Sequence, residues 1–118
     1  TSTNFKVKGK NFVQKKKILK DALAISNSGV FAIIIECVVE NLAKTITKNV
    51  SIPTIGIGAS RHCDGQILVT EDMLGLSDFS PKFVKKYTNL NKIMERCIKN
   101  YVKDVKMRRF PSFKNMYK

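Results

Sequence analysis

The sequence contains no tryptophan, and aromatic residues make up only 8% of its 118 positions. A packed core must therefore rest mainly on isoleucine, valine, leucine and alanine. The 43% hydrophobic content is enough for one ordinary domain. Long apolar runs are also absent. No stretch approaches the roughly 20 apolar residues that a membrane-spanning helix needs, so we expect no membrane partner.

Cysteine and histidine are scarce. Cys37, Cys63 and Cys97 are odd in number and form no CxxC spacing, and Thr1 to Lys6 contains no apolar signal segment. We therefore expect free or buried thiols in a reducing compartment, with the cytoplasm as the location. His62 is the only histidine. Because nothing at a supporting spacing joins it and Cys63, a metal site is not supported there, and we expect His62 in a loop.

Acidic residues are few: nine Asp and Glu stand against 22 Lys and Arg, for a formal net charge of +13. Such an excess suits a polyanion partner, but it is equally typical of lysines spread over solvated helix faces. The basic residues are scattered and form no continuous stripe interleaved with aromatics, so we favour solvated faces and do not expect nucleic acid as a partner. The alternative function is a non-catalytic remnant whose basic surface binds a partner or nucleic acid.

Hydrophobic spacing indicates alternating helices and strands. The expected helices cover residues 12–28, 39–50, 80–87 and 90–105, and the expected strands cover residues 30–35, 54–59 and 66–70. The run from Val30 to Ile35 is continuously apolar, as in a parallel strand buried on both faces. Gly29 stands where a helix commonly ends in a residue with positive φ. A basic tail without periodicity starts at about residue 110.

The order of elements predicts an α/β fold with a parallel sheet. Three strands are too few to close a parallel barrel, which needs eight strands, and an open three-stranded sheet leaves exposed edges. We therefore expect residues 1–118 to form one partial domain, a segment of a larger β/α structure.

Glu36 follows the apolar strand directly. Ligands of parallel α/β proteins bind at the carboxyl ends of the strands. Burial at such a position raises the pKa of a carboxylic acid, which suits a general base. A carboxylate that stabilises the start of the next helix explains the same residue equally well. The pattern alone leaves both interpretations open.

Two further segments stand at strand ends. Gly56 and Gly58 allow a ligand to approach the backbone closely, but tight turn geometry explains them at least as well. They do not form the GxGxxG dinucleotide fingerprint. In the other segment, Asp64-Gly65 is a turn signal, and Gln66 is expected to start the third strand.

Taken in order, these segments resemble the ketopantoate hydroxymethyltransferase family over about residues 5–111. The segments that carry the resemblance are Phe5 to Lys10, Asp21 to Leu23, Gly29 to Val38, Leu42 to Lys44, Ser51 to Ala59, Cys63 to Val69, Asp72 to Leu76, Pro81 to Lys85 and Phe110-Pro111. A single piece is a weak signal, whereas the ordered set at matching spacings is highly specific.

The resemblance implies a (β/α)₈ TIM barrel, of which this chain is expected to supply about the last three β/α units. It implies transfer of a hydroxymethyl group from 5,10-methylenetetrahydrofolate to 3-methyl-2-oxobutanoate, giving 2-dehydropantoate. It assigns removal of the C3 proton to Glu36 as general base. It also implies a homo-oligomer and a Mg²⁺ ion that polarises the keto acid, with metal ligands on earlier strands and none in this chain. The residues that bind the folate are not identified.

The chain departs from the family pattern at several positions. Val39 replaces a proline after Glu-Cys-Val, Ser60 replaces a glycine after Gly58-Ala59, and Glu71 replaces a histidine. Arg109 replaces the glycine before Phe110, and the usual acidic end is basic here. With the metal ligands expected elsewhere, we expect this segment to be inactive by itself, or to complete a barrel supplied by another chain.

Overall fold

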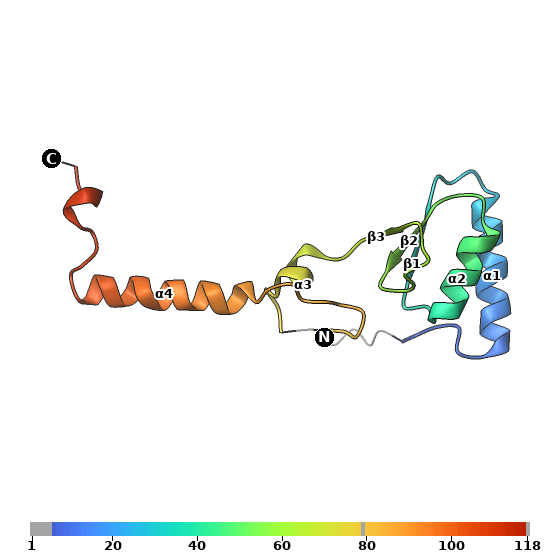
Figure 1. Cartoon of the computed structure of the whole chain (residues 1–118), viewed down its shortest axis with the longest axis horizontal. Helices are drawn as coiled ribbons and strands as arrows, with labels where there is room; N and C mark the ends of the chain where they lie inside the picture. The colour runs from blue at the N-terminus through green and yellow to red at the C-terminus, as the bar shows by residue number, and fades with distance from the viewer. Residues whose placement is uncertain (1–5, 79, 118) are drawn as a thin grey trace. The chain divides into compact units, whose positions relative to one another are not determined.

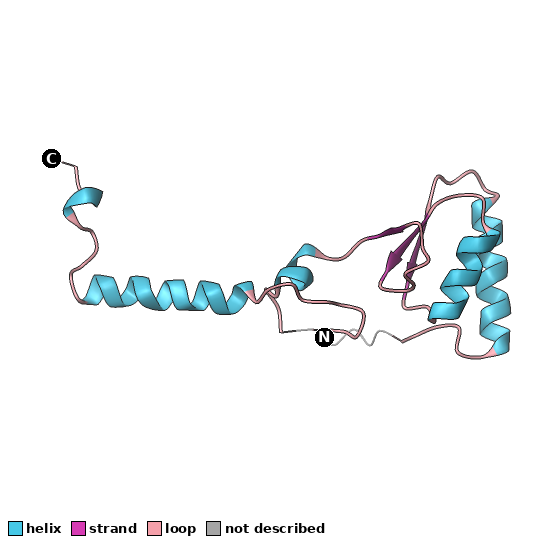
Figure 2. Ribbon diagram, viewed as in Figure 1, coloured by secondary structure: helices cyan, strands magenta, loops and turns pink. Residues whose placement is uncertain are grey.

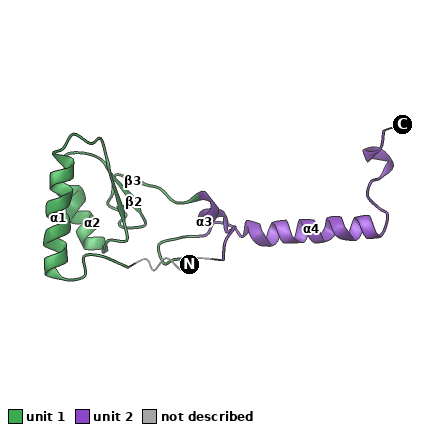
Figure 3. Ribbon diagram, turned by 180° about the vertical axis from the view of Figure 1, so that it is seen from behind, with its two compact units in different colours: residues 1–69, 80–85 green, residues 70–79, 86–118 purple. Residues whose placement is uncertain are grey.

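A computed structural model describes residues 6–78 and 80–117 (Figure 1). Residues 1–5, where no signal segment is expected and where the resemblance starts at Phe5, lie outside the described residues, as do Phe79 and Lys118. The chain divides into two compact units (Figure 3). Unit 1 comprises residues 1–69 and 80–85, and unit 2 comprises residues 70–79 and 86–118. The single partial barrel domain over residues 1–118 stays a prediction.

Unit 1 is a three-stranded parallel sheet covered on one face by two helices (Figures 1 and 2). The strands are β1 (Ile33–Glu36), β2 (Thr54–Ile57) and β3 (Gly65–Gln66), in the order β1-β2-β3. The helices are α1 (Phe12–Ser26) and α2 (Glu40–Asn49). The predicted α/β class and the parallel pairing are confirmed. A closed barrel stays a prediction.

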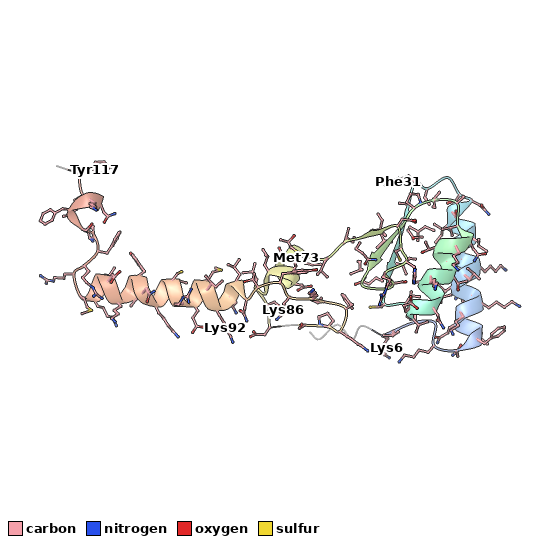
Figure 4. All side chains as sticks on the ribbon, in the orientation of Figure 1. Lys6, Phe31, Met73, Lys86, Lys92 and Tyr117 are labelled. Atoms are coloured by element: carbon pink, nitrogen blue, oxygen red, sulfur yellow. The ribbon has the colours of Figure 1, made fainter. Side chains whose placement is uncertain are left out.

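Local signals set the bounds of α1. The side chain of Asn11 caps the helix by accepting a hydrogen bond of 2.9 Å from the N–H of Gln14. At the other end the chain leaves the helix after Ser26, and Gly29 has the positive φ (+90°) that the sequence predicts. Phe31 follows on the connection to β1 and is 90% exposed (Figure 4), so the expected strand begins only at Ile33.

The core lies between the sheet and the helices. Ile35 of β1 packs with Leu42, Ala43 and Ile46 of α2, and Ala22 of α1 completes this group of buried side chains. Ile46 is only 1% exposed. These residues recur at helical spacing on α2 and at alternate positions on β1, which is why one face of each element is apolar.

The opposite face of the sheet is apolar but is not covered by the helices. Because side chains alternate along a strand, Ile34 and Glu36 face away from α1 and α2. The register places Ile55 beside Ile34, and Ile57 beside Glu36. Ile34 is 59% exposed. Parallel strands are normally buried on both faces, so this face has the composition of an interior without its cover.

The connection from β2 to β3 runs over the helix-covered face as a loop. The loop buries Ala59, Ser60 and Cys63. It ends at Asp64, whose Oδ2 accepts hydrogen bonds from the backbone N–H of Thr54 at 2.8 Å and from its hydroxyl at 3.1 Å. The Thr54 side chain is fully buried. These two bonds, the backbone N–H first, hold the pKa of Asp64 below its ordinary value.

Two expectations about elements are corrected. The third strand was predicted over 66–70, but it comprises only Gly65–Gln66 with one further hydrogen bond, from the Ile67 N–H to the Gly56 carbonyl. The predicted helix over 80–87 is wrong. Residues 81–84 form a turn in which the Val84 N–H donates to the Pro81 carbonyl at 2.9 Å. Phe83 lies close to Gly58, and a local proline signal cannot foresee such a contact with a residue distant in the sequence.

Unit 2 contains α3 (Thr70–Leu74), α4 (Leu90–Lys106) and a single 3₁₀ turn, η1 (Phe113–Asn115). The sequence did not predict α3. The predicted helix over 90–105 is confirmed as α4, which begins after Asn89, whose side chain accepts from the Lys92 N–H. The Asn91 N–H, in the first turn of α4, donates to the Gly75 carbonyl at 3.2 Å. Nearly all of α4 is exposed, including apolar residues such as Ile98.

No helix in the described ranges is both long and apolar enough to cross a membrane.

Ile46 is expected to be a principal contributor to the stability of unit 1. We expect Ile46→Ala to lower the free energy of unfolding by about 3 kcal/mol, because it removes buried apolar atoms and leaves a cavity. The matched change Ile34→Ala, on the uncovered face, is expected to cost less than about 1 kcal/mol. Urea denaturation followed by circular dichroism measures both. Equal losses for the two variants would contradict this account of the core.

Asp64 is expected to make stability depend on pH in the acid range. Its pKa is lower folded than unfolded, so its contribution is present above the unfolded value of about 3.9 and is lost as the pH falls through the folded value. Asp64→Asn should therefore be less stable than the parent at neutral pH and should lose less stability on acidification. Thr54→Val keeps the backbone donor and should give an intermediate slope. Urea midpoints measured between about pH 5 and pH 2 test this order.

Candidate active site

The candidate site lies where β1 and β2 end. Parallel strands present their carboxyl ends at the same edge of a sheet, and the register pairs Glu36, the last residue of β1, with Ile57, the last of β2. The expectation that Glu36 ends a strand is therefore confirmed. Ligands of parallel α/β proteins bind at this edge.

Glu36 is exposed in this structure. Its side chain is on the face of the sheet opposite the helices, and β1 is the outer strand. The described residues therefore do not bury the Glu36 side chain as expected. Its burial would require other atoms to pack against the uncovered face and the β1 edge of the sheet. The alternative of a helix-capping carboxylate is not supported by the hydrogen bonding: Val39 is the N-cap residue of α2, and Glu40 is the acidic residue of its first turn.

The turn after Glu36 is held in a defined conformation. Cys37 has φ +53°, a left-handed conformation that a residue with a side chain adopts at a cost. The Lys8 N–H donates to the Cys37 carbonyl at 2.7 Å, and the Val39 N–H donates to the Lys8 carbonyl at 3.1 Å. The N-terminal segment therefore pairs with the turn and fixes the direction in which the chain leaves β1.

The surroundings of Cys37 favour the protonated thiol over the thiolate. Desolvation raises its pKa, and the neighbouring Glu36 charge raises it further. The thiolate, not the thiol, is the reactive form. All three cysteines are free, as expected, with Cys63 buried and Cys97 exposed.

A cavity of about 370 Å³ opens beside this turn. Its walls come from Cys37 and Val38 after β1, from Ile57 and Gly58 at the end of β2, and from residues 81–83. Glu40, the first residue of α2, also lines it. Glu36 does not line this cavity. Cys37, which follows Glu36 directly in the chain, does line it.

Ser60 fixes the Glu40 carboxyl group. The Ser60 hydroxyl donates to Glu40 Oε1 at 2.9 Å and accepts from the His62 N–H at 3.1 Å. The Ser60 carbonyl accepts from the Gln66 amide at 2.7 Å. The sequence analysis assigned no functional role to Glu40 and placed it only in the expected helix over residues 39–50. A carboxylate one turn after a strand-end motif was the signal that could have pointed to it.

The two glycines of β2 and its end pack against their own chain. A Cβ on Gly58, which has φ +61°, would lie 2.7 Å from Phe83 Cβ and 2.9 Å from the Phe83 carbonyl oxygen. A Cβ on Gly56 would lie 2.8 Å from the Gln66 amide nitrogen. The sequence left open ligand approach and tight turn geometry; the structure adds close packing against the chain itself at both positions, and Gly58 also lines the cavity.

His62 lies in an exposed turn, as expected. Its neighbour Cys63 is buried, with Sγ 3.9 Å from the Thr47 hydroxyl oxygen. Within residues 6–78 and 80–117, no group of three or more His, Cys, Asp or Glu side chains could hold a metal ion. The described residues therefore do not fit the Mg²⁺ ion that the resemblance implies, and no catalytic step is derived through it.

Comparison with known proteins identifies the family. The family model for ketopantoate hydroxymethyltransferase matches residues 1–113 of the 118. The chain belongs to the ketopantoate hydroxymethyltransferase family. The resemblance drawn from ordered motifs is thereby confirmed.

Curated members of this family align with nearly all of the chain. It is 49% identical over 117 residues to the 3-methyl-2-oxobutanoate hydroxymethyltransferase of Pelagibacter ubique, covering 99% of this chain and 46% of that protein. It is 53% identical over 114 residues to that of Bartonella bacilliformis and 52% identical over 115 residues to that of Pseudothermotoga lettingae. Both alignments cover 97% of this chain, with 42% and 43% of the respective relatives. The chain thus spans less than half the length of these ketopantoate hydroxymethyltransferases.

Gly58 is expected to hold the cavity wall in position. We expect Gly58→Ala to cost about 1–3 kcal/mol, because a side chain is strained at this φ and would displace Phe83. Gly56→Ala meets chiefly the end of a glutamine side chain and should cost less. Hydrogen exchange at the Val84 amide, which bonds to Pro81, should accelerate in Gly58→Ala alone. Unchanged protection there would refute the proposed packing role.

Proposed function

We propose that this chain takes part in hydroxymethyl transfer from 5,10-methylenetetrahydrofolate to 3-methyl-2-oxobutanoate, in pantothenate biosynthesis, with Glu36 as the general base. Membership of the family supports the reaction. The observation that carries the role of Glu36 is its place at the carboxyl end of β1, at the start of a turn held by Lys8. A carboxylate at the ligand-binding edge of a parallel sheet is suited to removing a proton next to a carbonyl group.

In the proposed reaction, Glu36 takes the C3 proton of the keto acid, and the electron pair of the broken C–H bond forms the enolate. Water cleaves the two C–N bonds that hold the methylene carbon of the folate, which gives formaldehyde and tetrahydrofolate, with the two protons of the water on N5 and N10. The enolate C3 then bonds to the formaldehyde carbon, and the alkoxide so formed takes back the proton held by Glu36. One water molecule supplies the hydroxyl group of the 2-dehydropantoate formed. The Mg²⁺ ion that the resemblance implies would need ligands from outside the described residues, and no step of this reaction is assigned to it.

We further propose that unit 1 belongs to a (β/α)₈ barrel. The uncovered sheet face supports this, because Ile34, Ile55 and Ile57 form the kind of apolar layer that fills a barrel interior. Closing the barrel against this face would also bury Glu36, as general-base chemistry favours. A cytoplasmic location and a homo-oligomeric state are parts of the same proposal.

Replacement of Glu36 tests the catalytic role. This chain is first substituted for the matching region of the Bartonella relative, so that the complete length of that enzyme is present. We expect Glu36→Gln to slow exchange of the C3 hydrogen of 3-methyl-2-oxobutanoate for deuterium by at least about 100-fold, because the amide cannot accept the proton. Proton NMR of the substrate in D₂O measures this step without folate.

Glu95→Gln is the matched control. Glu95 is an exposed residue of α4 that pairs with Lys99 at 2.6 Å, and such surface pairs contribute little. Its exchange rate should equal that of the parent. Exchange at the parental rate in Glu36→Gln would rule out Glu36 as the base.

A further inference from the structure

The cavity beside the Cys37 turn has a chemistry that the proposed proton transfer does not use. Its walls are mainly apolar, with Val38, Ile57 and Phe83 among the lining residues. Among the described residues, the charged ones that line it are Glu40 and Lys82. Apolar walls with a few fixed polar groups are typical of small-molecule sites, and a volume of about 370 Å³ lies in their usual range.

Glu40 is fixed so that it can accept hydrogen bonds from a ligand. The Ser60 hydroxyl, in a residue that is only 5% exposed, holds Glu40 Oε1. Within the part of the chain that the structure describes, no protein donor bonds to Oε2. A carboxylate held at one oxygen is oriented for a charge-assisted hydrogen bond at the other.

The same groups disfavour the keto acid as occupant. A carboxylate in the wall repels an anionic substrate, and a cavity of about 370 Å³ is larger than a five-carbon acid fills. A planar heterocycle with N–H donors meets both conditions. It would cover the wall with its ring faces, pack against Phe83 and donate to Glu40.

We propose that this cavity binds the pterin ring of the folate co-substrate, with Glu40 accepting hydrogen bonds from the ring and Lys82 facing the anionic tail. This inference rests on the proposed function and names the subsite for its second substrate. Cys37 lines the cavity and directly follows Glu36 in the chain. A pterin held here therefore brings the one-carbon unit to the turn that carries the base.

Calorimetric titration of the chain with two probes tests the subsite. The probes are 5-formyltetrahydrofolate, which carries the reduced pterin, and p-aminobenzoylglutamate, which carries only the tail. We expect saturable binding of the first and at least tenfold weaker binding of the second. Glu40→Gln should weaken the first probe by at least tenfold, because a charged acceptor is lost. Glu71→Gln, a matched change in unit 2, should leave the affinity for 5-formyltetrahydrofolate unchanged.

The location is checked independently of any variant. Amide shifts on adding 5-formyltetrahydrofolate to the parent chain should concentrate at Cys37, Ile57 and Gly58. No saturable binding, equal binding of the two probes, or shifts confined to other residues would each overturn the subsite. If folate binds here but the complete enzyme exchanges no C3 hydrogen, the proposed function fails and the subsite stands. If exchange occurs but the cavity does not bind folate, only the subsite fails.

Discussion

Packing of Ile35 against α2 is the contact on which the rest of unit 1 depends. Ile35 is buried with Leu42, Ala43 and Ile46, and this contact sets the position of β1 relative to the helix that follows it. The carboxyl end of β1 and the N-terminus of α2 are then only a few residues apart. Glu36 and Glu40 therefore reach the same edge of the sheet from different elements, with the Cys37 turn between them.

The edge is reinforced by chain segments that are distant in the sequence. Lys8 pairs with the turn after β1, and Phe83 contacts Gly58 at the end of β2. Neither contact is a regular strand pairing. Each contact holds a loop that follows a strand in a defined conformation. Because these loops form the cavity walls, the cavity has a defined shape although the sheet is small.

The sequence predicted those features that depend on neighbours along the chain. Helical periodicity located α1, α2 and α4, and the apolar run ending at Glu36 located the carboxyl end of β1. The third strand was predicted too long because its apolar residues resemble a strand even where they lack a pairing partner. The cavity depends on Glu40 and Ser60, which are 20 positions apart, and on Phe83 near Gly58. No local pattern encodes such pairs, and the exposure of Glu36 depends on surfaces that local patterns do not describe.

The loop between β2 and β3 has a consequence for how the sequence can change. Parallel strands are usually joined through a helix, whereas here residues 58–64 make the return and bury Ala59, Ser60 and Cys63 beneath α2. Surface loops ordinarily accept insertions freely. This one acts as part of the helical layer, and both of its ends are tied, at Gly58 and at Asp64. Insertions and deletions should therefore be tolerated poorly within residues 58–64 and better in exposed connections such as Asn27 to Phe31.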